Sequence, residues 1–161
     1  MIEVEITEGI IKKAKEWHKH IIKSDRATIN ANGWLVGRIG TLIVADHYDI
    51  PPTSADEHYD ILVGDQKTVV KTKARNVPPL PYYDGTVPAQ SLDLLDADQF
   101  VFVSLYKQEK AYIMGAMSVG EFLEKSTAYK KGDVDLSNNF THHTAAYNIT
   151  YKELHGLEVL V

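Results

Sequence analysis

Residues 56–75 place one carboxylate beside a row of cations, at the spacing of a β-hairpin. Side chains of a strand alternate between its two faces. One face of segment 67–75 therefore carries Lys67, Val69, Lys71, Lys73 and Arg75. The other face is small and largely apolar, with Thr68, Val70, Thr72 and Ala74. The pattern predicts strands at 56–63, which includes Asp60, and at 67–75, joined by a tight turn at 64–66.

The cationic face of this hairpin indicates contact with water or with an anion. Four unpaired cations cannot be buried together, because desolvating each charge costs roughly several kcal/mol. A nucleic-acid phosphate is one anion that would suit Lys67, Lys73 and Arg75. In the alternative interpretation, the hairpin cations pair with Asp and Glu side chains nearby.

The flanking segments predict the elements that position this hairpin. Residues 8–23 and 33–46 have helical periodicity, and the second segment is apolar over most of its circumference. Residues 99–106 and 111–117 read as two neighbouring strands, and Ser118 with Glu121 forms a capping box that opens a further helix. Residues 24–32, 76–85 and 129–144 are expected to be irregular, and 147–151 to form a last strand. The predicted fold class is α/β, with a central mixed β-sheet flanked by helices.

The hairpin resembles that of the PD-(D/E)XK nuclease superfamily, which has the restriction-endonuclease-like fold. The similarity rests on Tyr59-Asp60-Ile61-Leu62-Val63 followed by Val69-Val70-Lys71-Thr72-Lys73. The helix at 33–40 and the strands around 100–103 and 112–115 occur in the order found in that family. The resemblance covers roughly residues 30–125 and implies a small DNA endonuclease of the kind that a phage or mobile element encodes.

The resemblance also implies roles for individual residues. Asp60 would bind Mg²⁺ together with the backbone carbonyl of Val70, and Glu57 is a further candidate ligand. Lys71 would be the catalytic lysine that positions water or stabilises the transition state. Lys67, Lys73, Arg75 and Arg38 would contact DNA, although Arg38 could equally extend its side chain to the surface or pair with a carboxylate.

Two positions depart from the family pattern. The acidic position two residues before Lys71 is Val69, and the helix position where related nucleases carry Glu is Arg38, after Gly37. Asp56, Glu57 or Asp65 would have to replace the missing carboxylate. Two hypotheses follow: an active Mg²⁺-dependent endonuclease, or an inactive nuclease-like fold that binds nucleic acid or protein.

Composition sets the remaining expectations. The 161 residues suit one domain, divided into an N-terminal helix and loop (1–30), a nuclease-like core (31–126) and a C-terminal extension (127–161). The chain has no cysteine, a net charge of −5 and no apolar run near the roughly 20 residues of a membrane helix. We therefore expect a cytoplasmic protein without a membrane partner. A homodimer follows by family analogy only, and His142-His143 is expected at the surface rather than on zinc.

Overall fold

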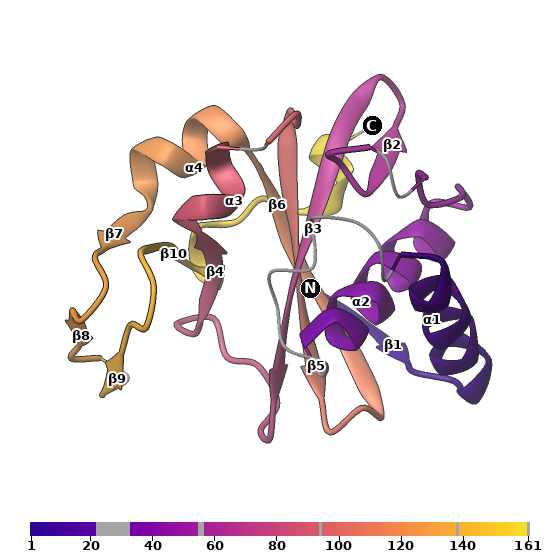
Figure 1. Cartoon of the computed structure of the whole chain (residues 1–161), viewed down its shortest axis with the longest axis horizontal. Coiled ribbons are helices and arrows are strands. Elements are labelled where there is room, and N and C mark those ends of the chain that lie inside the picture. Colours follow the sequence, from indigo (N-terminus) through magenta and orange to yellow (C-terminus); the bar gives the residue numbers. More distant parts are fainter. Residues whose placement is uncertain (22–32, 55–56, 94, 138, 161) are drawn as a thin grey trace.

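A mixed, twisted five-stranded sheet runs through the centre of the computed structural model, which describes residues 1–21, 33–54, 57–93, 95–137 and 139–160 (Figure 1). The strands, in order across the sheet, are β1 (Ile2–Glu5), β6 (Lys110–Ser118), β5 (Gln99–Tyr106), β3 (Gln66–Arg75) and β2 (Ile61–Val63). Strands β3 and β5 are parallel, and the other neighbouring pairs are antiparallel. Because β5 and β6 are buried along nearly their whole length, they form the middle of the molecule.

Two helices, α1 (Glu8–Ile21) and α2 (Gly33–His47), cover one face of this sheet (Figure 1). Residues 39–45 of α2 are buried in a core cluster that includes Ile61, Val70 and Val101. The helix approaches β3 closely at Gly40, where a Cβ atom would collide with the Thr72 side chain. The apolar circumference of α2 is thus explained by burial against both the sheet and α1.

A three-stranded antiparallel sheet lies on the opposite face, in the order β4 (Asp84–Pro88), β10 (Ala146–Thr150) and β7 (Thr127–Tyr129) (Figure 1). A second core cluster, containing Phe100, Phe102 and Phe122, fills the space between the two sheets. Gly85 of β4 packs directly on the Phe102 ring, where any side chain would collide. The short elements α3 (Ala89–Asp93), α4 (Val119–Lys125), β8 (Val134–Asp135) and β9 (Phe140–Thr141) complete this side.

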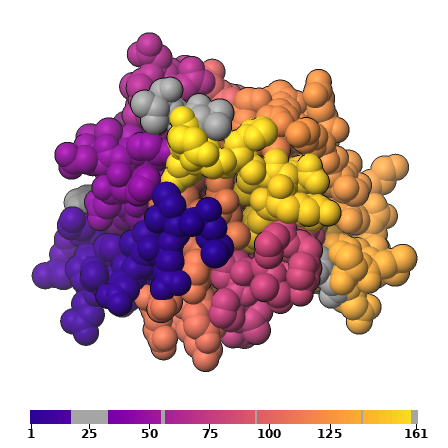
Figure 2. Space-filling view, turned by 180° about the vertical axis from the view of Figure 1, so that it is seen from behind, coloured from indigo at the N-terminus to yellow at the C-terminus, as the bar shows by residue number. Residues whose placement is uncertain are grey.

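The C-terminal segment connects the three-stranded sheet with the five-stranded sheet. It forms two 3₁₀ turns, Tyr151–Glu153 and Leu157–Leu160. Between them, His155 exchanges backbone hydrogen bonds of 2.9 Å with Ala116 of β6. Figure 2 shows this segment lying across the back of the molecule beside the first residues of the chain.

The predicted mixed α/β architecture is confirmed, as are the two long helices, the hairpin and the β5–β6 pair. The predicted N-cap at Ser118 is also confirmed, because its hydroxyl accepts a hydrogen bond from the Glu121 N–H (3.2 Å).

Three expectations about the secondary structure are wrong. Residues 57–60 precede strand β2 instead of belonging to it, residues 84–85 begin β4 instead of ending a loop, and 129–144 contains β8 and β9. Strand β1 was not predicted. The loop expected at 24–32 lies outside the described residues.

Within the described ranges, no helix is both long and apolar enough to cross a bilayer.

Candidate functional site

Asp60 is joined to strand β3 by its backbone and its side chain. Its N–H donates to the carbonyl of Thr68 (2.9 Å), next to the Ile61–Thr68 pair of the β2–β3 ladder. Its carboxylate Oδ2 accepts a hydrogen bond from the N–H of Val70 (2.8 Å). One carboxylate oxygen thereby takes the place of a ladder carbonyl, beyond the end of β2. Asp60 therefore stabilises the hairpin, whatever else it binds.

Val69, at the position of the missing acid, is an interior residue. Its side chain is 6% exposed and belongs to the core cluster between the two sheets. By strand alternation Lys71 lies on this same face of β3, and it is half-buried. The face that carries Lys71 is therefore apolar at Val69, where a nuclease would need a hydrated carboxylate.

The acids near Asp60 do not gather around it in the part of the chain that the structure describes. Within those ranges there is no group of three or more His, Cys, Asp or Glu side chains placed to hold a metal. Glu57 and Asp65 are exposed, and Asp56 lies outside the described residues. Mg²⁺ requires several oxygen ligands in octahedral geometry, and Asp60 alone supplies a single carboxylate to such a set.

Lys67 lies at the start of β3 in a surface ion pair. Its Nζ is 2.7 Å from Asp96 Oδ2, and its N–H donates to Asp98 Oδ2 (2.8 Å). The hydrogen bond with Asp96 raises the pKa of Lys67. Both partners of the ion pair are well exposed, so the pair contributes little to stability and exchanges readily with other ions.

Arg75, at the other end of β3, is enclosed. Its Nη2 donates to the carbonyl of Asp84 (2.8 Å), and its guanidinium lies 4.7 Å from the Tyr83 ring centroid and 5.8 Å from that of Tyr151. The expectation that the whole cationic face meets water or a ligand is wrong at this end, because strand β4 covers it. Aromatic faces and a backbone carbonyl replace the lost hydration of the guanidinium.

Lys73 is half-buried beside the same strand β4. Its Nζ lies 3.5 Å from Thr86 Oγ1. Burial, together with the charge of Arg75, lowers the pKa of Lys73, while Asp84 and Asp135 act in the opposite direction. The ammonium group therefore lies within a cluster of internal charges.

Arg38 joins the two helices, because its guanidinium lies 4.2 Å above the Trp17 ring. The structure thus distributes the predicted DNA-contacting residues. Lys67 is at an exposed end of β3, Lys73 and Arg75 are beside β4, and Arg38 is in the helical layer. Their contacts with DNA remain predictions.

The outer face of the three-stranded sheet forms a second candidate site. Asn148 of β10 is directly opposite Thr86 on one side and Thr127 on the other, while Thr150 is opposite Asp84 and Ala146 is opposite Tyr129. Directly opposed residues in antiparallel strands point to the same face. The opposite face of β10 carries Tyr147 and Ile149, which pack on the core. A row of polar side chains from three strands therefore lies on one surface.

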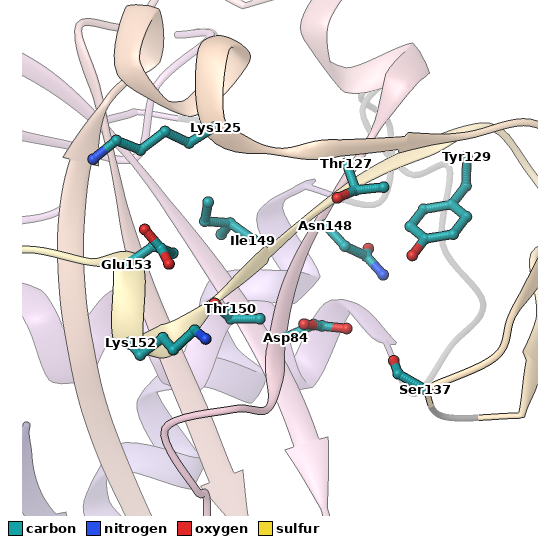
Figure 3. A pocket seen from close by; sticks show the side chains of 10 residues that line it. All are labelled: Asp84, Lys125, Thr127, Tyr129, Ser137, Asn148, Ile149, Thr150, Lys152 and Glu153. Atoms are coloured by element: carbon teal, nitrogen blue, oxygen red, sulfur yellow. The ribbon is translucent and has the colours of Figure 1, made fainter.

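Within this row, five side chains line a cavity of about 460 Å³: Asp84, Thr127, Tyr129, Asn148 and Thr150 (Figure 3). Figure 3 shows Asp84, Asn148, Tyr129 and Ser137 turned toward one space, with Lys125, Lys152 and Glu153 at the other end. Asp84 and Asn148 are each only 8% exposed, and Asn148 Oδ1 has no hydrogen-bond partner among the described residues. Burial, together with the charges of Asp135, Asp84 and Asp133, raises the pKa of Tyr129.

Sequence reasoning missed this cavity because its strands are short and paired over long distances along the chain. Residues 129–144 were expected to be irregular, and His142 was expected at the surface. His142 is instead 4% exposed and stacks on Tyr129, with ring centroids 4.3 Å apart. No local pattern indicates that Asp84 and Asn148 share a face, since that follows only from the register of β4 and β10.

Neither of the comparisons with known proteins relates the chain to another protein: no family model matches it, and no curated protein matches it significantly.

Proposed function

We propose that this chain is a nucleic-acid-binding protein with a restriction-endonuclease-like arrangement of strands, and that it does not hydrolyse phosphodiesters with Mg²⁺. The proposal that the chain does not hydrolyse phosphodiesters rests on the burial of Val69. A metal-dependent nuclease requires two or more carboxylates around the cation, and here the second position on β3 is filled by a core side chain.

The arrangement of elements supports the nuclease-like part of the proposal. The buried helix α2 precedes the β2–β3 hairpin, Asp60 contacts β3, and β5 pairs with β3 in parallel. The resemblance seen in the sequence implies this order of elements. Such a scaffold without its second carboxylate would retain a phosphate-facing surface and lose hydrolysis.

The cations at the open end of β3 support the nucleic-acid part. The Lys67–Asp96 ion pair is exposed, so a backbone phosphate can replace Asp96 at small cost. Lys71 lies on the same face of the strand beyond the buried Val69 and is half-buried, and the Tyr59 ring lies 5.7 Å from Lys67 Nζ. Lys73 and Arg75 have a smaller share in this surface, because strand β4 lies over them.

The second candidate function is an active DNA endonuclease in which Asp60 binds Mg²⁺ and Lys71 is catalytic. One observation favours it: the Asp60 carboxylate reaches the backbone of β3 at Val70, beside Lys71. A homodimer, which would let such an enzyme cut both strands, remains a prediction for analytical ultracentrifugation.

A plasmid assay distinguishes these functions. Supercoiled and branched DNA are incubated with the wild type and with Asp60→Asn and Lys71→Gln, in Mg²⁺ and in Mn²⁺. We expect a mobility shift without nicking for the wild type. Nicking that disappears in both variants would reject the proposal and establish the endonuclease. Nicking that persists in both variants would indicate a contaminating nuclease. A preparation freed of that nuclease must then show the mobility shift of the DNA without nicking.

A further inference from the structure

Paired β-strands supply much of the lining of the cavity on the outer face of the three-stranded sheet. Thr127, Asn148 and Asp84 come from β7, β10 and β4, whose register aligns them. Ser137 is fixed by Asp135, which accepts hydrogen bonds from its N–H (3.0 Å) and its hydroxyl (2.6 Å). Asp135 is itself only 4% exposed, so this wall of the cavity is anchored in the interior.

An unpaired acceptor points to a ligand in this cavity. Asn148 is more than nine-tenths buried and lines the cavity, and no donor in the described part of the chain reaches its Oδ1. Buried polar atoms are nearly always hydrogen-bonded, because leaving one unpaired costs free energy. A bound molecule with hydroxyl or N–H groups would complete this hydrogen bond.

The charges of the lining favour an uncharged ligand. Asp84 and Glu153 contribute two carboxylates, and Lys125 and Lys152 contribute two ammonium groups, so the ionisable acids and bases of the lining balance. Outside the lining, Asp133 and Asp135 act on Tyr129, whereas Lys73 and Arg75 lie beside Asp84, so the surrounding charges also have both signs. Lys125 is paired with Glu121 at 2.7 Å. A free anion or cation would meet no net opposite charge in this lining.

The hydrogen-bonding groups favour a ligand that both donates and accepts. Asp84 and Asn148 Oδ1 accept, while the hydroxyls of Thr127, Tyr129 and Ser137 do either. Hydroxyl groups on neighbouring carbons match this mixture, since each donates one hydrogen bond and accepts others. The volume lies within the range of about 300–1,000 Å³ that small-molecule sites occupy.

We propose that this cavity binds the vicinal diol of a neutral, hydroxyl-rich ligand, supplied by a pyranose sugar or by the ribose of a nucleoside. One hydroxyl donates to Asn148 Oδ1 and its neighbour donates to Asp84. The site is separate from the open end of β3, so the proposal does not rest on nucleic-acid binding there.

NMR titration of the ¹⁵N-labelled full chain tests the site. The probes are the methyl pyranosides of glucose, galactose and mannose, together with adenosine and uridine, at millimolar concentrations. Deoxyadenosine and thymidine lack the diol and serve as negative probes. We expect saturable shifts at Thr127, Tyr129 and Asn148 with at least one diol probe. Pyranoside binding identifies a glycan source, and binding of ribonucleosides alone identifies a nucleoside source.

Variants make the test specific. Asn148→Ala is expected to weaken binding at least about tenfold, the usual effect of one lost buried hydrogen bond. Asn76→Ala, at an exposed asparagine outside the cavity, should bind as the wild type does. Thr127→Val, at an exposed lining position, gives a second measurement should Asn148→Ala fail to fold. The proposal is overturned if no diol probe gives saturable shifts, if deoxynucleosides bind as well as ribonucleosides, or if the lining variants bind normally.

Discussion

The carboxylate of Asp60 accepts a hydrogen bond from the backbone N–H of Val70, with Oδ2 2.8 Å from the nitrogen. The residue that the sequence marks as a metal ligand is thereby a structural element of the hairpin. Its contact continues the β2–β3 pairing beyond Ile61, the first residue of β2. This role requires neither a metal nor a second carboxylate.

Replacing Asp60 should therefore reduce stability. In Asp60→Ala the Val70 N–H loses a charged acceptor, and we expect the free energy of unfolding to fall by about 1–2 kcal/mol. Urea denaturation followed by circular dichroism measures the change. Asp65→Ala, in the exposed turn between the same strands, is the matched control and should change stability little. Equal stability of the two variants would show that the hydrogen bond contributes nothing.

Introducing the acid of the nuclease pattern at position 69 should not create a metal site. Val69→Glu places a carboxylate among Phe100, Phe102 and the other residues of the inter-sheet core, where an unpaired charge is costly. We expect a loss of about 3 kcal/mol or more in unfolding free energy, and no cleavage with Mg²⁺ or Mn²⁺. Val77→Glu, at an exposed position beyond β3, should be nearly neutral. A stable Val69→Glu protein that cuts DNA would mean that position 69 can reach solvent and a metal.

The lowered pKa of Lys73 predicts a pH-dependent stability difference. The folded chain disfavours the charged amine, so the unfolded chain binds more protons between the lowered pKa and the ordinary value of 10.5. The destabilisation caused by burying the charged Lys73 amine is fully present below the lowered pKa. It is relieved as the pH rises toward 10.5. We therefore expect Lys73→Met to be more stable than the wild type near neutral pH, with an advantage that shrinks at alkaline pH.

Thermal unfolding of both proteins from neutral to alkaline pH measures this difference. The exposed Lys131→Met should show no such trend relative to the wild type. A Lys73→Met advantage that stayed constant or grew with pH would have the wrong sign for a desolvated lysine.

Much of the fold could be predicted because its patterns are local. Helix α2 shows an apolar circumference, β5 a continuous apolar run, and Ser118 with Glu121 a capping signal. Each feature reflects burial or hydrogen bonding within a few residues. The α/β class and the hairpin followed from these patterns.

The cavity and the covering of β3 could not be predicted in the same way. Strand β4 contains Gly85 and Pro88, which normally interrupt strands, and it forms because β10 pairs with it from far along the chain. That long-range pairing covers Arg75 and places Asn148 opposite Thr86. The face of cations was correctly identified as one face of a strand, but its neighbour was not visible in the sequence.

The salt dependence of DNA binding tests the central proposal most directly. Fluorescence anisotropy gives the Kd of wild type and of the double variant Lys67→Gln/Lys71→Gln over a series of salt concentrations. The matched control is Lys12→Gln/Lys13→Gln, at two exposed lysines of α1. We expect wild-type binding that weakens with salt, and a double variant whose slope of log Kd against log salt is smaller by roughly 1–2, since each lost phosphate contact removes about 0.7–0.9. Binding that is absent, or a slope unchanged in the double variant and reduced in the control, would contradict the account.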